Sequence, residues 1–349
     1  MNDVQTWRTA RIIPETASAV TIRFDTGDQP FIYQPGQFIN LTLIINDKTV
    51  TRSYSLSSVP GKDQQPAITV KAVPGGIMSN YILTHASDIK EWQVTGPFGA
   101  FVPVDTTWSA KHIVLLAGGS GITPLYSIAR AVTERSPDTH VTLIYANRTP
   151  EEIIFSHDIA SWQNSHPERI QVHHALSAHG DAALPNLVKG RLNKLVTRKL
   201  IKQSIEEPHT NVHYFICGPT GLMKMHQEML EAMQVPAENI FLEWFSPEPV
   251  KPDEILPDTP QEVLLHFYEQ SNLLDVNPGK TILEAALEDL IPLPYSCKGG
   301  TCGVCTAKLT AGKVKMRHNY ALRPSDIDEG MILLCQSFPL TADVTVEIG

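Results

Sequence analysis

The sequence CKGGTCGVC, residues 297–305, contains three of the chain's five cysteines, and a fourth follows at Cys335. The spacing of the four is C-x4-C-x2-C-x29-C, which is typical of the plant-type ligand set of a [2Fe–2S] cluster. Glycines between the cysteines let the backbone turn tightly around such a cluster, and their N–H groups can donate hydrogen bonds to sulfur. We therefore predict a metal centre whose ligands are Cys297, Cys302, Cys305 and Cys335.

Clustered cysteines have two other common uses in proteins, as zinc ligands and as disulfides. Zinc sites usually combine two C-x2-C pairs, or one such pair with two histidines, whereas this segment has a single pair. Disulfides need an oxidising compartment, and the N-terminal sequence MNDVQTWRTA lacks the apolar core of a secretion signal. The iron–sulfur interpretation fits the spacing best, and the chain is expected to be cytoplasmic.

The composition argues against several other classes of protein. The chain has 349 residues, which at about 150 residues per domain favours two or three domains. Its 42% hydrophobic and 19% charged residues provide for packed cores. With 28 basic and 37 acidic residues the net charge is −9, which argues against a nucleic-acid partner. The sequence also lacks an apolar run near the ~20 residues of a membrane span, so no span is expected.

The chain divides at two changes in its pattern. Residues 247–262, PEPVKPDEILPDTPQE, contain five prolines and five acids, which predicts an extended linker. Before residues 103–111, short β-rich runs alternate with turn residues, as in an antiparallel barrel. After them, strands alternate with helices, which indicates a doubly wound parallel sheet. The predicted order is a barrel at 1–106, an α/β domain at 107–246, the linker at 247–262, and a small domain at 263–349.

Individual elements follow from the same patterns. In the barrel, strands are expected at Val20–Phe24, Phe38–Ile45 and Ile68–Val73. In the α/β domain, strands are expected at 112–117, 141–146, 169–176, 213–218 and 239–245, with helices at 124–135 and 220–233.

Three further motifs connect this organisation with a known family. The sequence RSYSLSS at 52–58 has the pattern R-x-Y-S, PGQF stands at 35–38, and GGIMSNY at 75–81 contains a G-x-x-S element. With these motifs in this order, the whole chain resembles the ferredoxin–NADP reductase superfamily with a fused plant-type ferredoxin domain. The resemblance implies a FAD-binding barrel, an NAD(P)-binding α/β domain, and a [2Fe–2S] domain of the α+β, β-grasp type.

The resemblance also implies how the flavin is held. Arg52 takes the flavin phosphate, Tyr54 packs on the isoalloxazine ring, and Ser55 forms a hydrogen bond near the reactive nitrogen. Arginine suits the phosphate because its planar guanidinium makes bidentate contacts. Gly76 and Ser79 lie where a glycine turn and a helix N-terminus can bind the pyrophosphate through backbone N–H groups.

A second glycine motif, AGGSGITP at 117–124, follows a strand and opens a helix. We expect Thr123 to be the N-cap and Pro124 the first helical residue, so that the helix N-terminus faces an anionic diphosphate. The resemblance places CGP, residues 217–219, beside the nicotinamide ring, and Glu243 near the flavin. The predicted nicotinamide-site residues are Gly118, Gly119, Gly121, Thr123, Arg148, Cys217, Gly218 and Pro219, and the predicted catalytic residues are Ser55, Cys217 and Glu243.

The nicotinamide donor is left open between NADPH and NADH. The strand at 141–146 is followed by NRTPEE, so no acidic residue stands at the end of the strand to bind a ribose hydroxyl. Arg148, in this segment, can pair with a 2′-phosphate. This pattern favours NADPH. Elsewhere, His173, His174 and His179 form the only local histidine cluster, but no carboxylate or cysteine stands at ligand spacing, so a second metal site is not predicted.

These motifs predict an electron-splitting oxidoreductase. The resemblance implies that NAD(P)H reduces FAD, which passes single electrons to the [2Fe–2S] cluster and on to a partner protein. The sequence has no oxygen-activating motif, so the terminal chemistry is expected in another polypeptide, an oxygenase. LPYSCKGGTCGVC, GKVKMRHNYAL and LLCQSFPLTADVTVE are most similar to reductase components of the phenylacetyl-CoA epoxidase type, a multicomponent monooxygenase. The alternatives are a reductase for a hybrid-cluster protein, a desaturase or another aromatic oxygenase, and a redox-sensing binding module.

Overall fold

A computed structural model of the chain describes residues 4–27, 30–178, 184–205, 209–245, 257–295, 297–322 and 324–348. The described residues form two compact units, one of residues 4–97 and 101–245, the other of residues 98–100 and 257–348. Most of the expected linker, residues 247–256, lies outside the described residues, as does His179. The linker and the domain limits therefore stay predictions.

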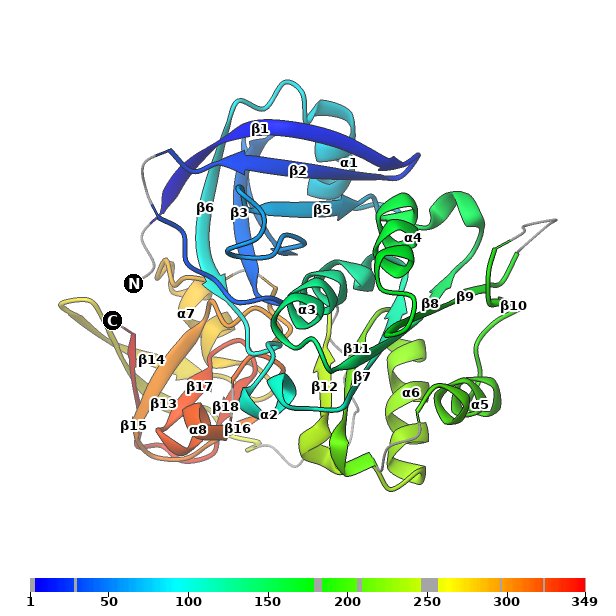
Figure 1. Ribbon diagram of the computed structural model, residues 1–349. Coiled ribbons are helices and arrows are strands. Elements are labelled where there is room, and N and C mark those ends of the chain that lie inside the picture. The colour runs from blue at the N-terminus through cyan, green and yellow to red at the C-terminus, as the bar shows by residue number, and fades with distance from the viewer. Residues whose placement is uncertain are drawn as a thin grey trace. The chain divides into compact units, whose positions relative to one another are not determined.

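The first unit contains the expected antiparallel barrel (Figure 1). Its strands are β1 (Gln5–Thr16), β2 (Ala19–Asp25), β3 (Phe38–Ile45), β4 (Lys48–Ser55), β5 (Ala67–Lys71) and β6 (Glu91–Phe98), paired in the order β4-β3-β6-β1-β2-β5. In the second half of β2, Ile22 and Phe24 are buried and Arg23 between them is exposed, as the alternation of strand side chains requires. Two of the three predicted strands match within a residue or two, and the third ends earlier than expected, at Lys71.

Aromatic side chains fill the centre of the barrel. The ring centroid of Phe24 lies 5.3 Å from that of Trp7 and 5.7 Å from that of Trp92, and all three side chains are fully buried. Both indole N–H groups are satisfied, because Trp7 donates to Gln5 and Trp92 donates to Thr9, each at 2.8 Å. This apolar core holds β1, β2 and β6 together.

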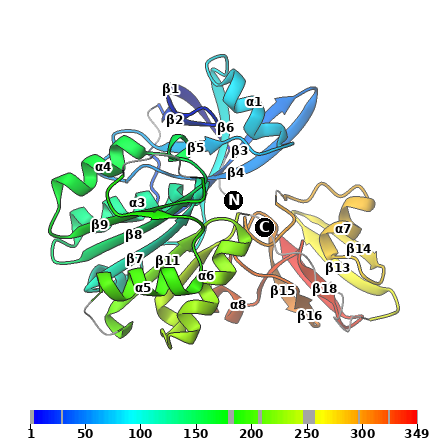
Figure 2. The ribbon, with the colours of Figure 1, turned by 90° about the vertical axis from the view of Figure 1, so that its right-hand side faces the viewer.

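The same unit contains the expected doubly wound α/β domain. Its parallel strands are β7 (His112–Gly118), β8 (His140–Asn147), β9 (Ile170–Leu176), β10 (Leu187–Lys189), β11 (Val212–Cys217) and β12 (Ile240–Glu243), in the order β10-β9-β8-β7-β11-β12. Its main helices are α3 (Ile122–Arg135), α4 (Ser156–Ser165), α5 (Lys194–Ser204) and α6 (Thr220–Ala232). Figure 2 shows α3 and α4 on one face of the sheet and α5 and α6 on the other. Every residue of β7 is buried because both faces are covered.

One predicted helix start is wrong. The sequence predicts Thr123 as the N-cap and Pro124 as the first helical residue, whereas α3 begins at Ile122, directly after a 3-10 turn at Gly119–Gly121. The Thr123 hydroxyl donates to the carbonyl of Ser120 at 3.0 Å, so it lies inside the first turn. The glycines allow the turn to tighten into 3-10 geometry and to continue into the helix without a separate cap.

The second unit has the β-grasp arrangement of a mixed sheet and one main helix. The strands β13 (Gln261–Phe267), β14 (Gln270–Val276), β15 (Thr306–Ala311), β17 (Met331–Leu333) and β19 (Val344–Ile348) pair in the order β14-β13-β19-β15-β17. The helix α7 (Ile282–Glu288) begins with a reciprocal capping box. The Thr281 hydroxyl accepts from the N–H of Glu284 at 3.2 Å, and the Glu284 carboxylate accepts from the N–H of Thr281 at 2.9 Å. The chain leaves this helix toward the cysteine segment.

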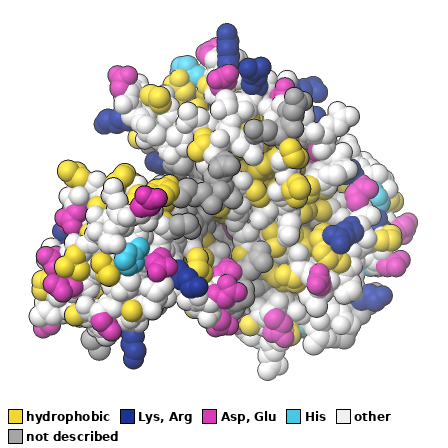
Figure 3. Space-filling model, turned by 90° about the vertical axis from the view of Figure 1, so that its left-hand side faces the viewer, with side chains coloured by type: hydrophobic (Ala, Val, Ile, Leu, Met, Phe, Trp, Pro, Cys, Tyr) yellow, Lys and Arg dark blue, Asp and Glu magenta, His cyan; other side chains and the backbone are white. Residues whose placement is uncertain are grey.

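Charged side chains of both signs are interspersed on one face of the protein (Figure 3). On the face shown in Figure 3, Lys and Arg side chains stand among Asp and Glu side chains. This mixture accords with the net charge of −9. No helix within the described parts of the chain is both long and apolar enough to cross a membrane.

Candidate functional site

The expected flavin residues lie on β4, at one end of the strand order of the barrel. Arg52 and Tyr54 are two residues apart, so they share one face of the strand. Arg52 is exposed, and its guanidinium donates to the carbonyl of Thr51 at 2.7 Å. Tyr54 is half-buried, and this burial raises the pKa of its hydroxyl. Ser55, at the end of β4, is buried. A cation with its fork facing solvent beside an aromatic ring suits a flavin phosphate and a flat ring.

The expected pyrophosphate residues lie at the start of α1 (Ile77–His85). Gly76 is the N-cap, and the Ser79 hydroxyl accepts a hydrogen bond from the N–H of Val73 at 3.3 Å. A Cβ atom on Gly76 would lie 2.5 Å from the Ser79 oxygen and 2.5 Å from a Val73 methyl group. A larger residue at Gly76 would therefore displace the side chain of Ser79 or Val73, and the Gly76 N–H itself donates to the carbonyl of Val73 at 3.0 Å.

The two halves of the expected nicotinamide site meet in the structure. They lie about 100 residues apart in sequence, but β7 and β11 are hydrogen-bonded neighbours, so Cys217 pairs with Ala117. A Cβ atom on Gly121 would lie 2.1 Å from the carbonyl oxygen of Cys217, and one on Gly118 would lie 2.7 Å from the Pro219 ring. The glycine turn thus packs directly on the Cys-Gly-Pro segment.

Cys217 and Glu243 form a buried pair at the carboxyl ends of β11 and β12. They are register partners across these parallel strands and are 1% and 7% exposed. Burial raises the pKa of Glu243 to about 8. Burial, with the nearby Glu243, also raises the pKa of the Cys217 thiol well above its usual value. Both groups are therefore protonated and uncharged at neutral pH.

Arg148 follows β8 and is exposed, and its backbone carbonyl accepts from the N–H of Ala178 at 2.7 Å.

The sequence did not reveal a second cation, Lys71 at the end of β5, which lies beside the glycine turn. Its amine lies 3.8 Å from where a Cβ of Gly119 would stand, and 3.3 Å from the Glu152 carboxylate. A lysine closing the strand sequence AITVK was the available signal, but only the fold brings it to the glycine turn.

The four predicted cluster cysteines come together in the second unit. All four are free thiols; Cys302, Cys305 and Cys335 are buried, and Cys297 is half-buried. Backbone N–H groups of Gly299 and Thr301 donate to the Cys297 sulfur at 3.3 and 3.4 Å, and that of Cys297 donates to the Cys302 sulfur at 3.5 Å. These donors stabilise negative charge on sulfur, as a thiolate ligand requires.

Contacts between the thiols tie the set together. Hydrogen bonds with Cys302 and Cys335 lower the pKa of Cys297, and the contact with Cys335 lowers the pKa of Cys305. The same contacts raise the pKa of Cys302 and Cys335. Within the described residues, no group of three or more His, Cys, Asp or Glu side chains is placed to hold a metal ion. The four free thiols match in kind and number the ligands that the two irons of a [2Fe–2S] cluster share, and in this respect the donor set fits the cluster.

Gln336 is a further neighbour of the cluster cysteines that the sequence did not reveal. Its side chain is 7% exposed, and its amide N–H₂ donates to the carbonyls of Lys298 and Cys335 at 2.9 and 2.7 Å. The same nitrogen lies 3.7 Å from the Cys335 sulfur. Gln336 therefore joins the cysteine loop to the segment that carries the fourth ligand. A glutamine beside a cysteine is too common for a sequence signal.

The chain thus combines residues suited to two-electron chemistry on flavin and nicotinamide with a thiol set suited to one-electron chemistry. This combination defines a class of protein, the nicotinamide-dependent flavoprotein reductases with an iron–sulfur domain. Comparison with family models agrees domain by domain. The oxidoreductase FAD-binding domain matches residues 8–102, the oxidoreductase NAD-binding domain matches residues 115–228, and the 2Fe–2S iron–sulfur cluster binding domain matches residues 267–340.

Relatives of known function span nearly the whole chain. The ferredoxin reductase component of 3-ketosteroid-9-alpha-monooxygenase from Mycobacterium tuberculosis is 34% identical over 97% of this chain and 94% of its own length. A component of 1,2-phenylacetyl-CoA epoxidase from Escherichia coli is 31% identical over 97% of this chain and 96% of its own. The chain belongs to this family of reductases, in which electrons pass from NAD(P)H through FAD to a [2Fe–2S] cluster.

Solved structures show the same fold. Phthalate dioxygenase reductase has a TM-score of 0.60 at 23% identity and matches 99% of this chain and 98% of its own. An intact type IV self-sufficient cytochrome P450 monooxygenase has a TM-score of 0.75 at 20% identity. The match covers 99% of this chain but only 41% of the P450 chain. At these identities the structures support the three-domain architecture alone.

Proposed function

We propose that this chain is the NADPH-dependent reductase of a multicomponent oxygenase and that its partner is an epoxidase acting on an aromatic acyl-CoA thioester. The packing of the glycine turn at Gly118–Gly121 on the segment Cys217–Pro219 carries the nicotinamide part of the proposal. The membership of the family supports the oxygenase part.

In this proposal the barrel binds FAD. Arg52 holds the phosphate, Tyr54 covers the ring, Ser55 forms a hydrogen bond near the reactive nitrogen, and Gly76 and Ser79 hold the pyrophosphate at the start of α1. When bound, FAD accepts a hydride and releases single electrons, and the cluster takes one electron at a time. The residues of the chain supply position and charge for these cofactors.

The nicotinamide nucleotide is placed by the α/β domain. Gly118, Gly119 and Gly121 let its diphosphate approach the backbone at the start of α3, with Thr123 within the first turn. Arg148 pairs with the 2′-phosphate of NADPH. Cys217, Gly218 and Pro219 flank the nicotinamide ring, and the uncharged Cys217–Glu243 pair keeps fixed charge away from the transferred hydride.

The partner assignment rests on one relative and on the tail of the sequence. The phenylacetyl-CoA epoxidase component from Escherichia coli is 31% identical over 97% of this chain, and the ketosteroid monooxygenase component is 34% identical over the same share. The reductase of glycine betaine monooxygenase from Pseudomonas aeruginosa is 31% identical over 98% of this chain. A direct comparison of these oxygenases as electron acceptors is therefore needed to decide which one is the partner. We also place the protein in the cytoplasm, where free thiols and iron–sulfur ligands stay reduced.

The test measures NADPH consumption and product formation with purified oxygenase components. Phenylacetyl-CoA with the epoxidase oxygenase is expected to stimulate turnover, whereas 3-ketosteroid or glycine betaine with their oxygenases is expected to do so weakly. The Cys302→Ser reductase is the control, because it lacks a cluster ligand but keeps the other two domains. Stronger stimulation by another oxygenase would move the partner assignment to it. Failure to reduce cytochrome c with NADPH would instead contradict the reductase function and favour a redox-sensing module.

A further inference from the structure

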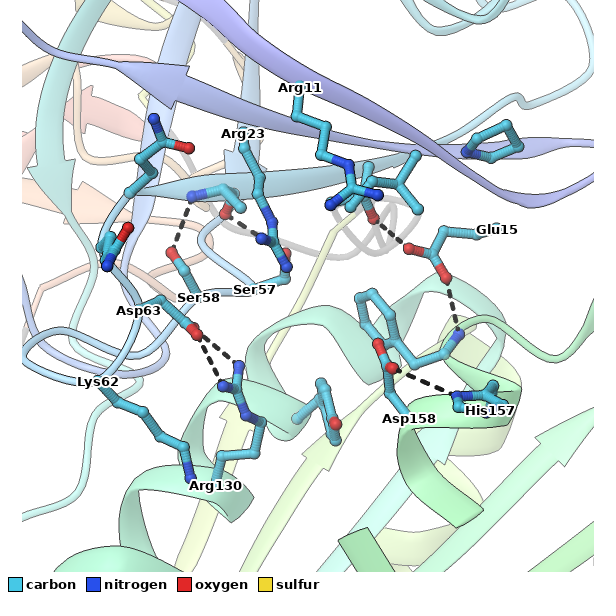
Figure 4. Close-up of a pocket in the computed structure, with 18 of the residues that line it drawn as sticks. Arg11, Glu15, Arg23, Ser57, Ser58, Lys62, Asp63, Arg130, His157 and Asp158 are labelled. Atoms are coloured by element: carbon cyan, nitrogen blue, oxygen red, sulfur yellow. Dashed lines mark hydrogen bonds and ion pairs between the residues drawn. The ribbon is translucent and has the colours of Figure 1, made fainter. Parts of the chain in front are cut away.

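A cavity of about 780 Å³ lies between the outer face of the barrel and helices α3 and α4. Figure 4 shows its polar lining, with side chains from β1 and β2 on one side and from the two helices on the other. None of the residues predicted to bind flavin or nicotinamide lines it. Its volume is in the range of small-molecule sites. The cavity is therefore separate from the redox sites.

Two arginines face this cavity from directly paired positions. Arg11 on β1 and Arg23 on β2 are register partners in the antiparallel ladder. Both are exposed and extend toward the cavity (Figure 4). Like charges placed directly opposite each other across a ladder repel and destabilise the sheet. In the described residues, no hydrogen bond or ion pair joins either guanidinium to another side chain, although Arg23 acts at longer range on Glu15 and Asp63.

The other cations of the cavity already have partners. Arg130 makes a bidentate ion pair with Asp63, with two N–O distances of 2.8 Å, and Lys62 pairs with Glu134 outside the cavity lining. Within the described residues the arginine pair therefore has no directly bonded acidic partner, although Glu15 and Asp158 line the same cavity.

The acids of the cavity define the opposite end of the site. Glu15 accepts from the Thr21 hydroxyl at 2.6 Å and from the backbone N–H of Phe155 at 3.3 Å, which joins the barrel to the start of α4. Asp158 stands in the first turn of α4. A ligand here needs an anionic group for the arginines and neutral hydrogen-bond donors for the carboxylates.

We propose that this cavity binds a small organic phosphate whose phosphate group bridges Arg11 and Arg23 and whose hydroxyl groups reach the acids near α4. A phosphate has enough oxygens to accept from both guanidinium forks at once, and its charge offsets both cations. A simple carboxylate offers two oxygens and one charge. The ligand spans the barrel and the nicotinamide domain, so its binding stabilises their contact.

The test titrates ribose 5-phosphate and inorganic pyrophosphate, each in turn, into the FAD- and cluster-loaded protein. Calorimetry measures the binding of each probe. Saturating NADP⁺ occupies the nicotinamide site, and sodium chloride matches the ionic strength. Arg11→Gln and Arg23→Gln are each expected to weaken binding of ribose 5-phosphate by about 10-fold or more. Lys90→Gln is the matched control, because Lys90 is exposed and does not line the cavity.

A second measurement guards against misfolding of the variants. Both arginine variants are expected to keep the NADPH–ferricyanide activity of the wild type. Without polyvalent anions they should unfold at the same or a higher temperature than the wild type, because one of two opposed charges has gone. The proposal is overturned if neither probe binds the wild type at concentrations up to about 10 mM, or if both arginine variants bind as tightly as Lys90→Gln.

Discussion

Cys217 and Glu243 lie directly opposite each other on the paired parallel strands β11 and β12, and both side chains are buried. Because burial raises the pKa of Glu243 to about 8, the carboxyl group keeps its proton at neutral pH. In the proposed nicotinamide site, these two groups would be polar but uncharged. This arrangement leads to the first prediction.

Glu243 should make the protein less stable as the pH rises. The folded pKa of about 8 lies above the ordinary value of 4.5, so between these values the unfolded chain loses a proton that the folded protein keeps. The stability therefore falls with rising pH across this window, by at most about 1.4 kcal/mol per pH unit, and levels off above it. We expect Glu243→Gln to remove this slope when melting temperatures are measured from pH 5 to 9.

Glu238→Gln is the matched control for this experiment. Glu238 is exposed and belongs to the turn just before β12. The control should follow the wild-type pH profile throughout. An unchanged profile in Glu243→Gln would show that the carboxyl group is ionised in the folded protein.

Gly121→Ala should disrupt nicotinamide binding. The new Cβ would lie 2.1 Å from the carbonyl oxygen of Cys217, so the glycine turn and the Cys-Gly-Pro segment must separate. We expect the rate of flavin reduction by NADPH to fall by about 100-fold. Stopped-flow absorbance measures this rate. Gly221→Ala is the control, because a Cβ there meets nothing within 4 Å. Equal rates in both variants would contradict the close packing.

Arg148→Ala should discriminate between the two nicotinamide nucleotides. Loss of a charge-assisted contact with the 2′-phosphate is expected to raise the KM for NADPH by about 10-fold or more and to leave the KM for NADH nearly unchanged. Steady-state ferricyanide reduction with each nucleotide measures this. Arg135→Ala, which removes a cation stacked on Trp108 instead, is the control. Equal effects on both nucleotides would place Arg148 outside the phosphate contact.

Cys302→Ser should separate the two kinds of electron transfer. The variant loses a buried cluster ligand, so iron content and cytochrome c reduction should fall to background, whereas flavin-level ferricyanide reduction should persist. Cys217→Ser is the matched variant, with full iron content expected because that thiol lies in the other unit. Loss of both activities in Cys302→Ser would mean that the domains do not act separately.

Gln336→Leu should lower the reduction potential of the cluster. The amide nitrogen is 3.7 Å from the Cys335 sulfur, and an N–H donor there favours the more negatively charged, reduced state. Removing one such donor is expected to lower the reduction potential of the cluster by about 20 to 60 mV. Gln336→Glu is the companion variant, because it keeps the size but adds negative charge and should lower the potential further. A potential equal to that of the wild type in Gln336→Leu would exclude this contribution.

Much of the fold and of the cofactor content could be predicted from local patterns. The cysteine spacing, the R-x-Y-S motif and the glycine turn are short-range features, and so is the change from strand-rich to alternating elements. Each motif places its residues on one strand or one turn, where the backbone geometry fixes the positions of these residues relative to one another. The strand at Phe38–Ile45 has the predicted limits for this reason. The start of α3 was missed because the glycines form a 3-10 turn at Gly119–Gly121 that continues directly into the helix at Ile122.

What the tertiary structure decided depends on distant neighbours. Only the pairing of β11 with β7 and β12 brings Cys217 to Gly121 and Glu243, and only burial there keeps Glu243 protonated. The register of β1 and β2 likewise sets Arg11 opposite Arg23. A sequence records which side chains exist and how far apart they stand along the chain. Desolvation and charge–charge distance are set by residues that pack from elsewhere, so the neutral acid and the paired arginines of the cavity became visible only in the folded protein.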